Sequence, residues 1–255
     1  MSLHHLPDLG WDEVVAVAPG AIAVLPVGSQ EQHGGHLPLG TDTMLVEAVL
    51  DEALAMFESD EHPTLVRLPA LNYGHSPHHQ FRAAISLNAE TLLHVVNECL
   101  DSLHTCGFRR VLVVNGHAGN TEILSLAVKQ FALRAPVAAA TCNYWAVGRD
   151  ECGTRAGSTV VAPGHAGWFE TSLMLAVRPE VVRTAGSQPA PTHAPMFIQP
   201  VHPGVLVASS GEWERVGGLT DDPATANVRD GNLILDRRIH GLVAAIRAFD
   251  TATTA

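Results

Sequence analysis

The stretch AIAVLPVGSQEQHGGHLPLGTDT, from Ala21 to Thr43, decides the fold and points to the chemistry. Its opening run, Ala21–Val27, is apolar and rich in β-branched residues, which predicts a buried strand that ends at Gly28. The loop after that strand carries carboxylate and imidazole groups close together: Glu31, His33 and Asp42. Burying such a group of charged side chains is costly unless they bind something, so we expect this loop to form half of a metal site.

Glu31 and His33 are two residues apart, so in an extended backbone their side chains point to the same side and can reach one ion. Asp42 follows a stretch rich in glycine and proline, which lets the chain fold back on itself. The two oxygens of Asp42 could then bridge two metals, as carboxylates do in two-metal hydrolytic sites. The alternative interpretation is that Asp42 caps a helix that begins near Thr43.

Composition restricts the class of protein. The chain has 255 residues, a length that suits one α/β domain, so we expect a single domain over residues 1–255. Its formal net charge of -11 argues against nucleic-acid binding, which needs clustered lysine and arginine. The N-terminus lacks the pattern of a secretory signal and the apolar runs are shorter than a membrane span, so we expect a cytoplasmic protein. No CxxC spacing that would favour a disulfide or thiolate zinc site occurs among Cys99, Cys106, Cys142 and Cys152.

Strand-like and helix-like segments alternate along the chain, which predicts an α/β fold with a mostly parallel central sheet and helices on its faces. After the first strand, strands are expected at 65–68, 110–114 and 137–144. Helices are expected at 43–57 and 88–105, from the NGHAGN motif to Arg134, after Glu170 and within 223–249. Two stretches rich in glycine, proline, serine and threonine, 148–164 and 186–204, are predicted to be long and functional loops.

Two further motifs follow predicted strands. An open parallel sheet binds ligands beyond the carboxyl ends of its strands, so VVNGHAGN at 113–120 should bring His117 beside the first loop. A bare anion-binding loop is the alternative, but the motif lacks the lysine and the spacing of a phosphate-binding loop. The third motif, PGHAGWFETSLML at 163–175, contributes His165 and Glu170. Glu170 could serve only as a partner of a helix dipole, yet three such motifs at three strand ends favour one metal site.

The motifs EQHGGHLPLGTD, VVNGHAGN and GHAGWFETSLML, in this order, resemble the creatininase family of metal-dependent amidohydrolases. The resemblance covers almost the whole chain, including FRAAISL at 81–87. It implies a three-layer α/β/α fold, a homohexamer and a dinuclear zinc or manganese centre. The metal ligands that it implies are Glu31 and His117 for one metal, His33 and Glu170 for the other, and Asp42 as the bridge. By the same resemblance, His165 is the catalytic histidine.

The chain departs from creatininase itself at two places. In creatininase a tyrosine and a glutamate follow the asparagine-glycine-histidine motif, where this chain has Ala118 and Gly119. Creatininase also has a tryptophan, an aspartate and a glutamate before the catalytic histidine, where this chain has Val161, Ala162 and Gly164. These departures argue against creatinine as the substrate, although the hydrolytic centre is retained.

The ligand set mixes carboxylate and imidazole groups, which suits zinc or manganese, with iron as a further candidate. A metal can lower the pKa of bound water to about 7, so our hypothesis is that metal-bound hydroxide attacks an amide carbonyl. His165 would then hand a proton to the departing nitrogen. Substrate contact is expected from His36, His78 and Ala118, with ordinary loop histidines as the alternative for the first two.

The sequence therefore predicts a metal-dependent amidohydrolase that cleaves the carbon–nitrogen bond of a small cyclic or linear amide. One alternative is a peptide-processing enzyme that resembles the mycofactocin-maturation peptidases, which an open groove at the loop 186–204 would favour. Another is a metal-binding scaffold subunit without turnover. The expected partners are a small amide or short peptide and further copies of the chain, with neither nucleic acid nor membrane.

Overall fold

The computed structural model describes residues 3–58, 63–148, 164–183, 195, 202 and 204–254. The strands in these ranges form one parallel sheet in the order β1-β3-β2-β4-β5. They are β1 (Leu3–His5), β2 (Ile22–Val27), β3 (Leu65–Arg67), β4 (Arg110–Asn115) and β5 (Ala138–Asn143). This sheet confirms the predicted α/β fold.

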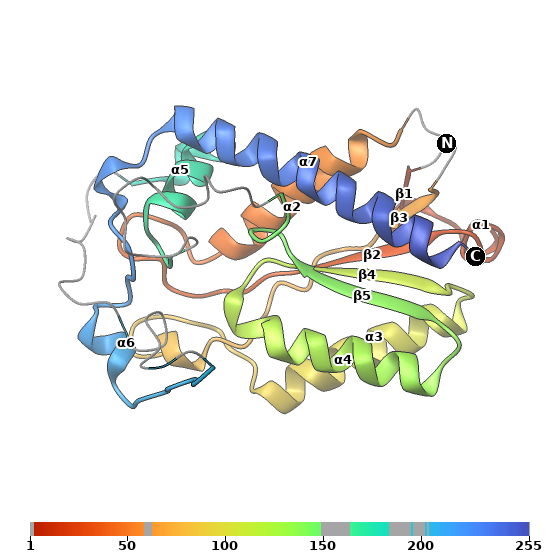
Figure 1. Ribbon diagram of the computed structural model, residues 1–255, viewed down its shortest axis with the longest axis horizontal. Coiled ribbons are helices and arrows are strands. Elements are labelled where there is room, and N and C mark those ends of the chain that lie inside the picture. The colour runs from red at the N-terminus through yellow and green to blue at the C-terminus, as the bar shows by residue number, and fades with distance from the viewer. Residues whose placement is uncertain are drawn as a thin grey trace.

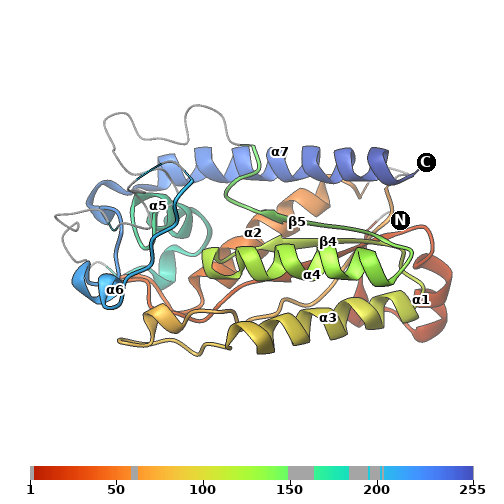
Figure 2. The ribbon, with the colours of Figure 1, turned by 60° about the horizontal axis from the view of Figure 1, so that its bottom comes forward.

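Helices cover both faces of the sheet, as Figure 1 shows. One layer contains α2 (Thr41–Ala55), α5 (Trp168–Val177) and α7 (Val228–Thr253). The other contains α3 (Ala89–Thr105) and α4 (Thr121–Arg134), and α1 (Trp11–Val17) packs against the same core. Figure 2 shows α3 and α4 together on the face of the sheet opposite α7. The expected three-layer architecture is therefore confirmed.

The central strand β2 shows why both layers are needed. Every residue of β2 is buried. Ile22 and Val24 face the core under α2, α5 and α7, whereas Ala23 and Leu25 face the core under α3 and α4. Successive side chains of a strand point to opposite faces, so a strand covered on both faces is a continuous apolar run.

The topology places a binding crevice between β2 and β4. The two strands pair in register up to Val27 and Asn115, so they end at the same level. From β2 the chain crosses through α2 to β3 on one side, and from β3 it crosses through α3 to β4 on the other. Open α/β sheets bind ligands at such a switch point, beyond the carboxyl ends of the strands. The loops that follow Val27 and Asn115 meet there.

Besides short 3-10 turns, the described residues contain one strand and two helices that the sequence patterns did not predict: β1, α1 and the short helix α6 (Glu212–Arg215). β1 reads LHH and α6 has four residues, so neither segment is long enough to produce a periodic pattern. The closing helix begins at Val228, because Pro223–Thr225 forms a separate 3-10 turn before it.

Several predictions fall partly outside the described ranges. Cys99, Cys106 and Cys142 are free, whereas Cys152 lies outside the described residues. Most of the predicted loops 148–164 and 186–204 also lies outside them. None of the helices within the described ranges has the length and apolar character needed to cross a bilayer.

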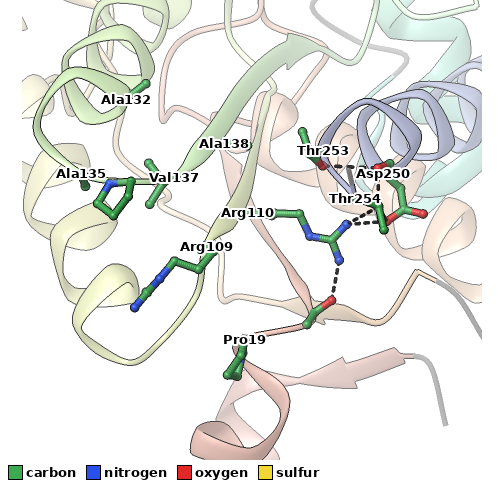
Figure 3. A pocket seen from close by; sticks show the side chains of 12 residues that line it. Pro19, Arg109, Arg110, Ala132, Ala135, Val137, Ala138, Asp250, Thr253 and Thr254 are labelled. Carbon is green, nitrogen blue, oxygen red and sulfur yellow. Dashed lines mark hydrogen bonds and ion pairs between the residues drawn. The ribbon is translucent and has the colours of Figure 1, made fainter.

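The amino end of the sheet holds a cavity of about 750 Å³, shown in Figure 3. Arg110 donates hydrogen bonds there to the carbonyl of Gly20, the carboxylate of Asp250 and the hydroxyl of Thr254. It therefore ties the start of β4 to the end of α7. Arg109 points away from Arg110 and donates to nearby backbone carbonyls. The described lining of this cavity contains one carboxylate, which is already paired, and lacks the group of ligands that a metal site needs.

Replacing Arg110 by methionine removes the charged hydrogen bonds but keeps an apolar stem of similar length. We expect the free energy of unfolding to fall by about 1 to 3 kcal/mol, measured by urea denaturation. Arg134→Met is the matched control, because the bonds of Arg134 to Asp101 and Asn97 are exposed. It should change stability by less than about 0.5 kcal/mol. Equal losses in the two variants would contradict the role given to Arg110.

Candidate metal centre

Four groups of side chains among the described residues have the geometry to hold a metal ion, and Glu31 belongs to three of them. Two of these groups pair Glu31 with His78 and His79, or with His33 and His165. The other two consist of the ligands expected from the sequence. The first group contains Glu31, Asp42 and His117, all of them buried. His117 Nε2 lies 3.3 Å from Glu31 Oε2, and His117 Nδ1 lies 3.2 Å from Asp42 Oδ2. These residues come from the loop after β2, the first turn of α2 and the loop after β4. The switch point of the sheet therefore brings them together.

The second group contains His33, Asp42 and Glu170. His33 Nε2 lies 3.2 Å from Asp42 Oδ1 and 3.7 Å from Glu170 Oε2. Asp42 thus belongs to both groups and directs one oxygen toward His33 and the other toward His117. A carboxylate in this position can bridge two ions. The structure brings together all the side chains that the sequence marked as metal ligands.

The first turn of α2 shows that Asp42 is not a helix cap. The helix begins at Thr41, and its N-cap is Gly40, which has no side chain to bond the backbone. The carboxylate of Asp42 faces His33 and His117 instead, so the capping alternative is wrong. Its place in the first turn still favours a negative charge, because the helix dipole is positive at that end.

Glu170 has a structural role as well as a place in the second group. It lies in the first turn of α5, and its Oε2 accepts a hydrogen bond of 2.6 Å from the backbone N–H of Ala166. Ala166 has a φ of 54°, a left-handed conformation that is uncommon for a residue with a Cβ. Strained backbone of this kind gathers at functional sites, where the surrounding structure holds it in place.

The residues present fit a divalent cation. Both carboxylate oxygens of Glu31 and Oδ2 of Asp42 are buried, and no described donor reaches them with hydrogen-bonding geometry. Buried anions without donors are costly, and a cation that binds several oxygens at once removes that cost. The mixture of carboxylate oxygens and imidazole nitrogens is a donor set found with zinc and manganese.

Burial and neighbouring charges shift the pKa values of the group in different directions. Burial lowers the pKa of His33, but Asp42 and Glu170 outweigh it and raise this pKa to about 10. Burial also lowers the pKa of His117, yet Glu31 and Asp42 raise it to about 9. Burial raises the pKa of Glu31 and of Glu170 to about 7. In the metal-free protein, protons on the two histidines therefore balance the carboxylates at neutral pH.

His165 lies beside the first group and is oriented by the loop after β2. Its Nε2 donates to the backbone carbonyl of Gln32 at 2.8 Å, so its Nδ1 faces Glu31 Oε1 at 3.5 Å. The side-chain amide of Gln32 donates to Nδ1 of His79 and to the carbonyl of Gly218. Burial, together with nearby histidines, lowers the pKa of His165 well below its usual value. His165 is therefore a neutral imidazole with its free nitrogen directed at the site.

The residues predicted to contact substrate lie in different places. His78 and Ala118 line a cavity of about 70 Å³ together with Glu31, Asp42, His117 and Glu170. The ring of His78 stacks on that of His117, with 5.9 Å between centroids. His36 is 2% exposed and lies outside the described lining of this cavity. Its Nε2 is 2.9 Å from the hydroxyl of Thr171 in α5, which fits a role in placing that helix.

Ser76, His79 and Trp145 also lie at the site, although no sequence motif marked them. His79 Nε2 lies 3.4 Å from Glu31 Oε1, and Ser76 Oγ lies 3.2 Å from His117 Nε2. Trp145 lines the 70 Å³ cavity. Ser76 and His79 follow β3 and Trp145 follows β5, so the rule that ligands gather at the carboxyl ends of strands applies to them too.

A buried amide joins the loops that carry these residues. Asn120 Nδ2 donates to the carbonyl of Gly28, and Asn120 Oδ1 accepts from the N–H of His75. The loops after β2, β3 and β4 are therefore fixed to one another. A Cβ on Gly74 would lie 2.7 Å from both Asn120 Oδ1 and the Gly28 carbonyl, so no larger residue fits there.

Comparison with known proteins identifies relatives over most of the chain. The family model described as creatininase, creatinine amidohydrolase, matches residues 7–246. The mycofactocin precursor peptide peptidase of Mycobacterium tuberculosis is 36% identical over 224 residues, which cover 83% of this chain and 78% of that protein. The creatinine amidohydrolase of Pseudomonas putida is 30% identical over 264 residues, which cover 94% of this chain and 95% of that protein.

Solved creatininase structures share the fold. A manganese creatininase superposes with a TM-score of 0.76 at 27% identity and covers 96% of this chain and 97% of its own. A mutant creatininase of the zinc–zinc type superposes with a TM-score of 0.75 at 28% identity, with the same coverage of 96% and 97%.

Metal binding should release protons. His33 and His117 are protonated at pH 7 in the metal-free protein, because their pKa values are raised to about 10 and about 9. A histidine must lose its proton to bind a metal, so zinc affinity should rise as the pH is raised from about 6 to about 8. Isothermal titration calorimetry in two buffers with different ionisation enthalpies counts the released protons. Proton uptake, or an affinity that does not change with pH, would contradict this expectation.

Replacing Asp42 by asparagine should remove most of the bound metal, because Asp42 belongs to both groups. Elemental analysis of protein purified without added metal measures the loss. Asp51→Asn is the matched control. Asp51 lies on the same helix, but its side chain is exposed and accepts a hydrogen bond from Arg67. Equal metal content in the two variants would show that Asp42 does not bridge two ions.

Proposed function

The chain belongs to the creatininase family of hydrolases that act on carbon–nitrogen bonds, and from this premise we propose that it is a metal-dependent amidohydrolase. The chain would bind two divalent ions, either zinc or manganese, with iron as a further candidate. Their ligands would be Glu31 and His117, His33 and Glu170, and the bridging Asp42. The observation that carries the proposal is the placement of the two Asp42 oxygens, one toward each histidine.

When bound, a pair of divalent ions polarises a carbonyl and lowers the pKa of water to about 7. The chain supplies the remaining chemistry. The carboxylates balance the charge of the ions, and His165 takes up a proton at Nδ1 and delivers it to the leaving nitrogen. Its lowered pKa makes the protonated form a ready donor. The Gln32 carbonyl holds the proton on Nε2, so Nδ1 remains the nitrogen that reacts.

The walls of the site favour an amide other than creatinine. A Cβ on Gly119 would collide with the carbonyl of His75 and with Nε2 of His117, so the glutamate that creatininase has in this loop does not fit here. Ala118 lines the cavity where creatininase has a tyrosine. The contacts that creatininase makes through these residues are therefore absent from this part of the site.

A short peptide is the second candidate substrate. The 36% identity to a mycofactocin precursor peptide peptidase supports it, because peptides also present a hydrolysable amide. Gly164 lines the cavity, whereas Val161 and Ala162 lie outside the described residues. The loop 186–204, whose openness was expected to separate peptides from small amides, lies almost entirely outside them as well. Hydrolysis across a panel of small amides, creatinine and short peptides separates the candidates.

We also propose that residues 1–255 act as one domain and assemble as a homohexamer, as the family resemblance implies. Sedimentation velocity measures the assembly. Metal bound without hydrolysis of any amide in the panel would favour a scaffold role over an enzyme.

Replacing His165 by alanine should lower turnover by about 100- to 10,000-fold while leaving the metal content unchanged. Both are measured on one preparation, turnover on the most active amide of the panel and metal by elemental analysis. His94→Ala is the control, because His94 is exposed on α3. Loss of metal from the His165 variant would place His165 among the ligands and contradict its role in proton transfer.

A further inference from the structure

A second cavity adjoins the candidate metal centre. It has a volume of about 330 Å³ and shares His78 with the cavity of about 70 Å³ that contains the ligands. Pro77, Phe81 and Trp213 also line it, along with the rest of the segment 209–214. Most of its wall on the side of His78 is therefore made of rings.

Trp213 lines the second cavity and packs against rings that line the metal cavity. Its ring centroid lies 5.0 Å from that of His78, 4.5 Å from that of His79 and 5.5 Å from that of His165. His79 and His165 line the metal cavity, whereas Trp213 lines the second one. The ring of Trp213 therefore separates a group bound in the second cavity from His165, the proposed proton carrier.

The volumes of the two cavities suit different parts of a substrate. About 70 Å³ is enough for ions and a reacting group, but pockets for whole small molecules measure about 300 to 1,000 Å³. The neighbouring cavity, at about 330 Å³, has room for one side chain of a substrate. A substrate that reaches the metals with its amide can therefore place a side chain beside Trp213.

The chemistry of the wall selects the kind of side chain. The rings of His78, Phe81 and Trp213 line one side of the cavity, with 5.0 Å between the centroids of His78 and Trp213. Two carboxylates also line it: Glu212, which accepts a hydrogen bond of 2.9 Å from Arg215, and Glu214. The ring wall, rather than the carboxylates, provides a surface on which a planar apolar group can stack, and such a group is therefore favoured on that side.

We infer that this second cavity binds an aromatic ring of the substrate, next to the amide that is hydrolysed, and that Trp213 determines this specificity. The inference rests on the proposed function for the position of the amide. It narrows the substrate class to amides or short peptides that carry an aromatic side chain near the bond cleaved.

The affinities of two small carboxylic acids, one with a phenyl ring and one without, test the inference. Neither acid has an amide, so the measurement does not depend on turnover. Isothermal titration calorimetry on the zinc-loaded full chain compares 3-phenylpropanoate with propanoate. Burial of the ring should make 3-phenylpropanoate bind at least about tenfold more tightly. Equal affinities in the wild-type protein would overturn the inference.

Variants of Trp213 test whether the phenyl ring of 3-phenylpropanoate binds in the second cavity. Trp213→Ala should reduce the difference between the two ligands to about threefold or less, whereas Trp213→Phe should keep most of it. Trp11→Ala is the matched control, because Trp11 is 81% exposed on α1. Ser210→Phe adds a ring at the rim of the cavity and should also abolish the difference, which covers the case that Trp213→Ala does not fold. An undiminished difference in folded Trp213→Ala or Ser210→Phe protein would overturn the inference.

The hydrolysis panel separates this inference from the proposed function. Peptides that differ only in phenylalanine or alanine beside the bond should differ about tenfold or more in kcat/KM. Hydrolysis without this preference would leave the proposed function intact and overturn the inference. Ring-dependent binding without any hydrolysis would support the cavity as a ring site and contradict the proposed function.

Discussion

The burial of carboxylates close to one another is the constraint on which this structure depends. Glu31, Asp42 and Glu170 are buried, and Asp42 belongs to one candidate metal group with Glu31 and to another with Glu170. His33 and His117 provide positive charge, yet three carboxylate oxygens still have no described hydrogen-bond donor. Such an arrangement is unfavourable by itself and becomes favourable when divalent cations replace the protons. This arrangement supports the proposal that the site binds divalent metal.

The fold meets this constraint through close packing at the carboxyl end of the sheet. β2 and β4 end at the same level, so the loops after them approach the first turn of α2. Gly116 makes that approach possible, because a Cβ there would lie 2.6 Å from the backbone oxygen of Asp42. A Cβ on Gly28 would likewise lie 2.7 Å from the Cα of Thr43. These glycines are required for contact between backbones, and that contact places His117 beside Asp42.

The sequence predicts the parts of the fold that have strong local patterns. β2 and the interior of β4 are apolar runs, and the polar motifs after them identify the proposed ligands. Ser76, His79 and Trp213 were missed because their importance comes from tertiary placement rather than from spacing. Trp213 belongs to a helix of four residues, which has no periodicity, and only the fold brings its ring against His165. The contact of His36 with Thr171 could not be predicted for the same reason, because no sequence motif indicates it.

The central claim is that Asp42 lies between two metal ions. X-ray diffraction from zinc-loaded crystals, recorded above and below the zinc absorption edge, tests it directly. The account predicts two anomalous peaks per chain, one beside Glu31 and His117 and one beside His33 and Glu170, with an oxygen of Asp42 bound to each. A single peak, or two peaks of which only one contacts Asp42, would contradict it.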